Sequence, residues 1–81
     1  MDNLKFVQLL RGLYEKALHH PVQIEDLQGE NVIERLKIDS LIALQLIITI
    51  EKAFSVVIDD DELAIQMIDN PSRLYEFVNK Q

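Results

Sequence analysis

Cysteine and tryptophan are absent from the 81 residues of the sequence, and glycine and proline occur only twice each. Without cysteine the chain has no disulfide framework and no thiolate ligand for a metal ion, so any thiol chemistry must come from a group outside the sequence. Gly12 and Gly29 stand alone, which excludes a glycine-rich loop that cradles phosphate. With 48% hydrophobic residues, the composition favours a folded helical domain over a disordered segment.

Positive charge is scarce, because eight basic residues oppose fourteen acidic ones and leave a formal charge of −6. This balance disfavours nucleic acid and anionic membrane surfaces and favours partners with basic faces. The longest strongly apolar run, from Leu41 to Ile50, is too short to cross a bilayer. The N-terminal segment is interrupted by charges and does not have the pattern of a signal peptide. We therefore expect a soluble, cytoplasmic monomer that is not stably inserted in a membrane.

The spacing of apolar residues predicts an all-α fold, a small four-helix bundle with three longer helices and one short helix in a single domain, residues 1–81. Apolar residues recur every three or four positions from Phe6 to Leu18, which predicts a first helix capped by Asn3. Pro21 should end it near His19. The periodicity then fails up to Lys37, which predicts a long loop between the first two long helices. A single turn over residues 33–36, preceded by Asn31, interrupts this loop.

The second long helix is expected over residues 40–54, with Asp39 and Ser40 at its start. Its broad apolar face is predicted to contain Leu44, Ile47, Ile50 and Phe54, and the edges of its polar arc to contain Ile42, Leu46 and Ile48. The D-x-x-E spacing of Asp59 and Glu62 predicts the start of the short helix. Asn70 and Pro71 predict the cap and first residue of the last helix.

Catalytic and metal sites find little support in the sequence. His19 and His20 are adjacent, so their side chains diverge on a helix, and no third ligand stands near them. The acidic run that begins at Asp59 has Ala64 and Asn70 where a calcium loop needs glycine and glutamate. A serine beside an acid suggests a nucleophile, but nothing places a histidine base beside Ser40. We expect no catalytic residue and no metal site, and on their own Asp39 and Ser40 indicate simple helix capping.

A wider pattern surrounds Asp39-Ser40-Leu41 and covers nearly the whole chain. It comprises Leu36 to Leu41, then Leu44, Leu46, Ile50 and Glu51, then Phe54 to Ile58, and finally Leu74 to Val78. This pattern resembles the acyl carrier proteins. The Asp-Ser-Leu core is short, but its mid-chain position in an acidic, cysteine-free, free-standing domain of this length makes the combination specific.

By that resemblance the chain is a carrier and not an enzyme. A phosphopantetheinyl transferase would move 4′-phosphopantetheine from coenzyme A onto Ser40, and the thiol of the arm would hold acyl intermediates as thioesters for acyl-loading and acyl-processing enzymes. A phosphodiester on Ser40 would lie at a helix N-terminus, where free N–H groups favour an anion. Asp39 would cap the helix and help to hold magnesium during the transfer. The candidate walls of an acyl cavity are Leu44, Leu46, Ile47, Ile50 and Phe54.

Three positions depart from the usual motif of this family. Lys37 stands where the family has glycine, and Ile42 and Gln45 stand where it often has acids. Since lysine adopts a positive φ less easily than glycine, we expect a changed loop backbone at Lys37. Fewer acids and one more apolar residue indicate a more hydrophobic docking face. We assign Leu41, Ile42, Gln45, Ile48, Thr49 and Lys52 to it. The sequence therefore predicts a carrier for a specialised lipid, fatty acid or polyketide-type pathway.

Three alternatives stay open. Ile42 and Ile48 could be core residues of a slightly rotated helix. The pair Gln45-Leu46 also fits an aminoacyl carrier of the D-alanyl type, which a different activating enzyme would load. Finally, the chain could be an unmodified helical interaction module that binds a partner through residues 41–54. Only this last alternative predicts that Ser40→Ala leaves function intact.

Overall fold

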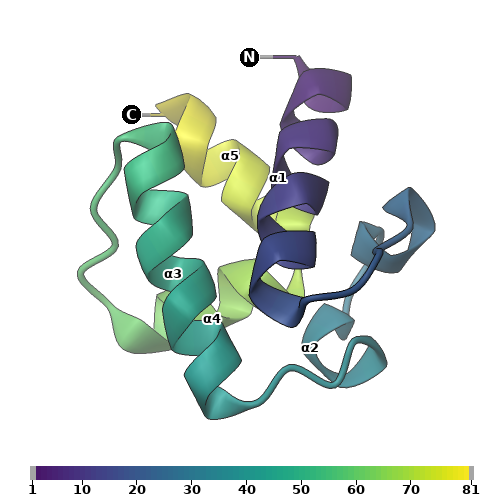
Figure 1. Cartoon of the computed structure of the whole chain (residues 1–81). Helices are drawn as coiled ribbons and strands as arrows, with labels where there is room; N and C mark the ends of the chain where they lie inside the picture. Colours follow the sequence, from purple (N-terminus) through teal and green to yellow (C-terminus); the bar gives the residue numbers. More distant parts are fainter. Residues whose placement is uncertain (1, 81) are drawn as a thin grey trace.

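The computed structural model describes residues 2–80, which form helices joined by loops (Figure 1). In chain order the elements are α1 (Asn3–Leu18), the 3-10 turn η1 (Ile24–Leu27), α2 (Val32–Arg35), α3 (Ser40–Phe54), α4 (Asp61–Asp69) and α5 (Pro71–Lys80). The predicted all-α fold is confirmed, since α1, α3, α4 and α5 form the small four-helix bundle and the single predicted turn is α2. The ends of the predicted domain, Met1 and Gln81, lie outside the described residues.

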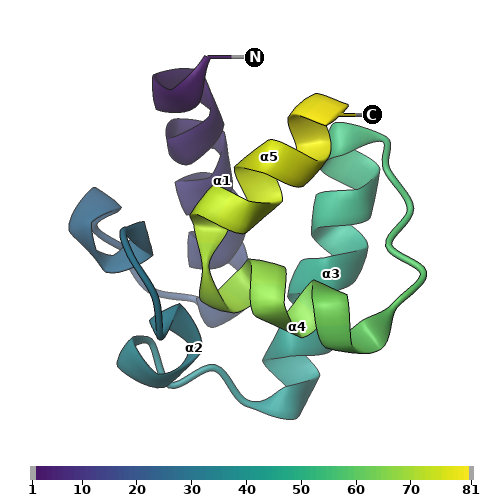
Figure 2. The same ribbon diagram turned by 180° about the vertical axis from the view of Figure 1, so that it is seen from behind.

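The helices are arranged so that α3 starts at one end of the bundle, and α1 starts and α5 ends at the other (Figure 1). α1 and α3 pack side by side and run in opposite directions (Figure 1). α4 and α5 cross behind them, as the reverse view shows (Figure 2). The segment with η1 and α2 contacts α1 and α4 and carries the chain from the end of α1 to the start of α3. The start of α3 is therefore set apart from the start of α1 and the end of α5.

The core is built from one face of each long helix. Its buried side chains include Phe6, Leu10 and Tyr14 of α1, Ala43, Leu46 and Ile50 of α3, Ala64, Met67 and Ile68 of α4, and Leu74 of α5. The ring of Phe6 packs against Phe54, with ring centres 5.3 Å apart, and edge-on against Tyr75 at 5.1 Å. These aromatic contacts join α1, α3 and α5, as offset and edge-to-face ring pairs commonly do in protein cores.

The hydroxyl of Tyr14 is the polar link between α1 and α4. It donates a 2.7 Å hydrogen bond to the carbonyl oxygen of Ile68. That carbonyl belongs to the last turn of α4, where carbonyl groups lack partners within the helix. Burial, and secondarily the negative charge of Asp69, raises the pKa of Tyr14 far above its usual range. Tyr14 is therefore a neutral donor throughout the range in which the fold is stable.

Two predicted helix caps are wrong by one residue. Asp2, and not Asn3, caps α1, because its side chain accepts a 2.9 Å hydrogen bond from the N–H of Lys5. Asp60, and not Asp59, caps α4 through the N–H of Leu63 at 3.1 Å. In each case two adjacent residues can cap, and the one whose backbone is extended at the helix boundary does so. The sequence does not distinguish such neighbours.

The cap of the last helix agrees with the sequence. Pro71 is the first residue of α5, and Asn70 accepts a 3.2 Å hydrogen bond from the N–H of Ser72. Asn31 precedes α2 as predicted, but it has a left-handed backbone, with φ of 64°, and its side chain makes no capping hydrogen bond.

Candidate functional site

The N-terminus of α3 is capped by Asp39 and leaves two backbone donors open. One carboxylate oxygen of Asp39, Oδ1, accepts a 2.9 Å hydrogen bond from the N–H of Ile42, and its carbonyl oxygen accepts one from Ala43 at 2.9 Å. Among residues 2–80 the N–H groups of Ser40 and Leu41 have no hydrogen-bond partner. Free N–H groups of this kind, together with the helix dipole, favour an anion.

Ser40 is the first residue of α3 and its side chain is exposed. Because Ser40 is exposed, its hydroxyl is open to a transferase that would attach a phosphodiester to it. The open N–H donors of Ser40 and Leu41 suit such an anionic group. The residues at the start of α3 therefore fit the prosthetic group that the sequence predicts there.

The turn that leads into α3 has an unusual backbone at Lys37. Its φ is 56°, in the left-handed region, so the expectation that lysine would avoid a positive φ here is wrong. Two hydrogen bonds close the turn, from the N–H of Lys37 to the carbonyl of Glu34 at 3.2 Å and from that of Ile38 to the carbonyl of Ile33 at 2.9 Å. These are the two bonds of a cap at the end of α2, and a cap of this kind places one residue in the left-handed conformation, which accounts for the φ of Lys37.

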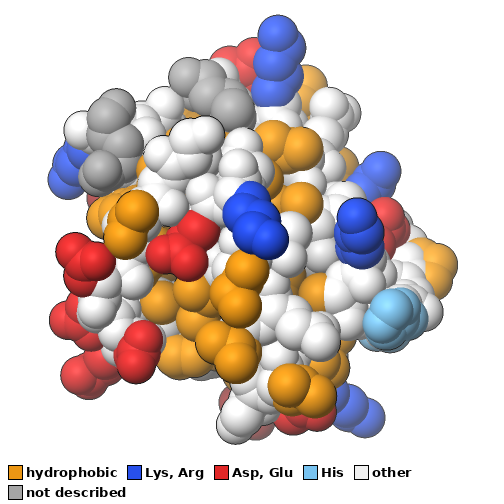
Figure 3. All heavy atoms as spheres, turned by 60° about the vertical axis from the view of Figure 1, so that its left-hand side comes forward, with side chains coloured by type: hydrophobic (Ala, Val, Ile, Leu, Met, Phe, Trp, Pro, Cys, Tyr) orange, Lys and Arg blue, Asp and Glu red, His pale blue; other side chains and the backbone are white. Residues whose placement is uncertain are grey.

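An apolar stripe lies exposed along α3. It consists of Leu41, Leu44 and Ile48, which are 65%, 54% and 44% exposed. Their spacing of three and then four residues places them on one side of the helix. Figure 3 shows hydrophobic side chains gathered on this side of the molecule, with acidic side chains along one edge. The stripe begins one residue after Ser40, so it borders the candidate attachment site.

The residues predicted for the docking face are only partly together on the surface. Leu41, Gln45, Ile48 and Lys52 are exposed. Thr49 is half-buried, and its hydroxyl donates a 2.7 Å hydrogen bond to the carbonyl of Gln45. Ile42 is half-buried and packs against the core, as the rotated-helix alternative holds, whereas Ile48 does not.

The predicted faces of this helix are wrong at Leu44 and Leu46. Leu46 is fully buried, whereas Leu44, proposed as a cavity wall, faces outward. Ile50 is also buried, and Ile47 and Phe54 are partly buried against the core. The core-facing line of α3 runs through Ala43, whose small side chain gives a weak hydrophobic signal in the sequence, so the helix is rotated from the predicted orientation. No signal in the sequence separates the exposed Leu44 from the buried Leu46.

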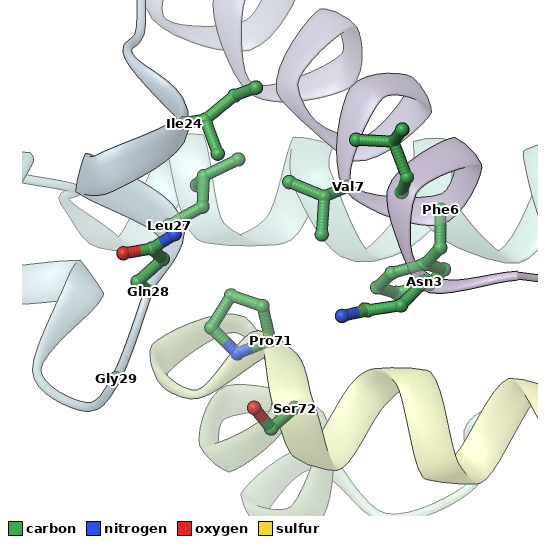
Figure 4. A pocket seen from close by; sticks show the side chains of 10 residues that line it. Asn3, Phe6, Val7, Ile24, Leu27, Gln28, Gly29, Pro71 and Ser72 are labelled. Carbon is green, nitrogen blue, oxygen red and sulfur yellow. The ribbon is translucent and has the colours of Figure 1, made fainter.

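Hollows in the described surface lie apart from the five predicted cavity residues. The largest of those described, about 450 Å³, lies between the start of α1, η1 and the start of α5 (Figure 4). A second, of about 360 Å³, lies between α1 and α3 and is lined by Leu13, Lys16, Ala17, His19, Gln45 and Thr49. Along α3, Gln45 is about 7.5 Å from Ser40, at 1.5 Å of rise per residue. Neither hollow has Leu44, Leu46, Ile47, Ile50 or Phe54 in its wall.

The helices between residues 2 and 80 fall short of what a bilayer-crossing segment requires in length and apolar character. Those residues hold no group of three or more histidine, aspartate or glutamate side chains arranged to bind a metal ion.

Comparison with known proteins identifies the family. The model of the phosphopantetheine attachment site family matches residues 8–78, which include the capped start of α3, the apolar stripe and most of α5. No match was found among curated proteins or among solved structures. Domains of this family generally carry intermediates and do not catalyse reactions themselves. The chain therefore belongs to the phosphopantetheine attachment family, as its resemblance to the acyl carrier proteins predicts, and its prosthetic group is 4′-phosphopantetheine.

Proposed function

We propose that this protein carries acyl groups on 4′-phosphopantetheine attached to Ser40, and that it serves a specialised lipid, fatty acid or polyketide-type pathway. The observation that carries the proposal is the exposed Ser40 at the start of α3, beside two open backbone donors. When bound, the prosthetic group supplies a thiol that holds the acyl group as a thioester. The chain itself presents the arm and is recognised by the enzymes that load and process its cargo.

Asp39 has two roles in this proposal. Its Oδ1 fixes the first turn of α3 through the N–H of Ile42. Its second carboxylate oxygen has no hydrogen-bond partner in residues 2–80 and can hold the magnesium ion that accompanies coenzyme A during the transfer. The same side chain thus orients Ser40 and contributes a negative ligand beside it.

The apolar stripe is an argument that the partner enzymes of this protein differ from those of an ordinary fatty acid carrier. The first turn of α3 contains no acid, although by resemblance a family member often has one two residues after the serine. Leu41, Leu44 and Ile48 instead expose apolar surface next to the arm. We propose that partner enzymes dock on the apolar stripe together with Gln45, Thr49 and Lys52, and that Leu44 takes the place assigned to Ile42 from the sequence.

An aminoacyl carrier of the D-alanyl type is the second candidate, because the pair Gln45-Leu46 fits it. An assay that offers the modified protein either an amino acid with an adenylating enzyme or an acyl donor with an acyl transferase would separate the two candidates.

The attachment itself is tested by intact mass spectrometry after incubation with coenzyme A, magnesium and a broad-specificity phosphopantetheinyl transferase. We expect the wild-type chain to gain one phosphopantetheine unit and Ser40→Ala to gain none. Ser72→Ala is the matched control, because Ser72 is also exposed in the first turn of a helix. No gain with a competent transferase, or a gain that survives in Ser40→Ala, would contradict the proposal and favour the unmodified interaction module.

A further inference from the structure

We propose that Lys37 is a positioning residue for the prosthetic group. Its ammonium pairs with the phosphodiester on Ser40 and holds the first atoms of the arm against the turn of residues 36–39. This inference rests on the proposed attachment at Ser40.

Lys37 lies within reach of the phosphate and its side chain is uncommitted. It precedes Ser40 by three residues, a stretch of chain that spans at most about 10 Å even when fully extended. The side chain is exposed, and its ammonium has no hydrogen bond or ion pair with any of residues 2–80. The flexible four-carbon stem of lysine can therefore turn toward an anion on Ser40.

Among the charged residues near Ser40 in the sequence, Lys37 is the cation best able to pair with the phosphodiester. Asp39 places a carboxylate beside the attachment site and repels a phosphate. Arg35, the preceding basic residue, is already occupied, because its guanidinium donates to the carbonyl groups of Glu25, Gln28 and Glu30. The next basic residue in the sequence is Lys52, in the last turn of α3. Lys16, at the end of α1, lies at the same end of the bundle as the start of α3 and is the alternative cation.

The backbone at Lys37 is that of an ordinary helix C-cap and fixes where the lysine stands. The bonds from Lys37 to Glu34 and from Ile38 to Ile33 close the end of α2, and such a cap places one residue in the left-handed conformation. His19 and Ser55, which follow α1 and α3, have the same conformation. The cap therefore holds the backbone of Lys37 in a defined turn three residues before Ser40.

The strength of the pairing sets the size of the expected effect. In water, the attraction between two opposite unit charges about 7 Å apart raises the equilibrium constant for pairing by about threefold. The attraction should disappear at high ionic strength, where the screening length falls to about 3 Å in 1 M salt.

The test is competitive acetylation of the lysine amines in the full-length chain before and after attachment of phosphopantetheine, followed by peptide mass spectrometry. Because pairing occupies the amine, we expect Lys37 to react about threefold more slowly in the modified protein at low salt, and equally fast in both forms at 1 M salt. Lys52 is the internal control, since it lies about 18 Å from Ser40 along the helix axis and should not change.

A second measurement separates the effect of the charge of Lys37 from the effect of its backbone conformation. In ³¹P NMR of the modified protein, Lys37→Asn should shift the phosphodiester resonance, because asparagine tolerates the left-handed conformation but has no charge, and Lys37→Arg should restore it. Equal reactivity of Lys37 in both forms, or a slowed Lys16 in its place, would overturn this inference alone. Failure to detect phosphopantetheine on Ser40 by mass would overturn the proposed function as well.

Discussion

At the scale of single residues, the left-handed turn before Ser40 combines a chemical role with a loss of stability. Lys37 has a φ of 56° and carries a charge that the neighbouring site can use. Glycine would suit the backbone better, but it could not supply the charge. The residue that best fits the fold and the residue that best serves the phosphate therefore differ at this position.

This difference predicts the effect of Lys37→Gly on stability. A left-handed conformation costs a non-glycine residue about 1–2 kcal/mol, and the greater freedom of glycine in the unfolded chain offsets part of the gain. We expect the free energy of unfolding to rise by about 0.5–1 kcal/mol, measured by urea denaturation with an unchanged slope. Lys37→Ala is the control, because it removes the charge but keeps the strain. An equal gain in Lys37→Ala would show that charge, and not backbone strain, sets the stability here.

At the scale of elements, α3 has two apolar faces, one buried in the core and one on the surface. Ala43, Leu46 and Ile50 pack into the core, while Leu41, Leu44 and Ile48 remain on the surface. Eight apolar residues between Leu41 and Ile50 exceed what one buried face requires, and the second face explains the surplus. The apolar stripe begins one residue after Ser40, so an enzyme that docks on it, as proposed, lies beside the proposed attachment site.

The docking proposal predicts how the carrier responds to restored acids on α3. We expect the modified wild-type protein to be a poor substrate for a standard fatty acid synthase set, and Ile42→Asp with Gln45→Glu to raise kcat/KM for elongation by about 2–5-fold per added charge. Since Ile42 is half-buried, the fold of the variant is checked by urea denaturation.

Ile65→Asp is the control for each added charge, because it adds one negative charge at an exposed apolar residue of α4. An equal gain per added charge in Ile65→Asp would mean that overall charge matters and the position on α3 does not. Efficient elongation of the wild-type protein, with no gain from the added acids, would contradict the specialised docking face.

The elements also show what the sequence could and could not establish. The helices, their order and the start of α3 followed from the 3.6-residue periodicity and from residues such as Asp39 and Pro71. The rotation of α3 did not, because Leu44 and Leu46 are chemically alike and only packing around Ala43 decides which is buried. Similarly, no property of Lys37 itself indicates a positive φ, since the hydrogen bonds that close the end of α2 impose it.

At the scale of the whole molecule, the buried hydroxyl of Tyr14 couples global stability to alkaline pH. Its pKa is raised by burial in the folded protein, so the unfolded chain loses this proton first, near a pH of about 10. Above that pH the unfolded state binds fewer protons than the folded state, and stability falls as pH rises. Below it the contribution is fully present and does not vary with pH.

Tyr14→Phe isolates this effect. At neutral pH we expect the variant to lose about 1–2 kcal/mol, because the carbonyl of Ile68 is left buried without a donor. Above a pH of about 10, the wild-type protein should lose up to about 1.4 kcal/mol more per pH unit than the variant, as measured by chemical denaturation. Parallel pH profiles of the two proteins would show that Tyr14 ionises without unfolding and would contradict its assignment as a buried neutral donor.

The helix termini are divided between the two ends of the bundle. The start of α1 and the end of α5 lie at one end, and the start of α3 lies at the opposite end (Figures 1 and 2). A tag, a fused protein or a solid support joined to either terminus would therefore stand behind the bundle as seen from Ser40. Such a tethered carrier should keep its arm and its apolar stripe open to visiting enzymes, which makes attachment through the termini the suitable geometry for capturing those enzymes from solution.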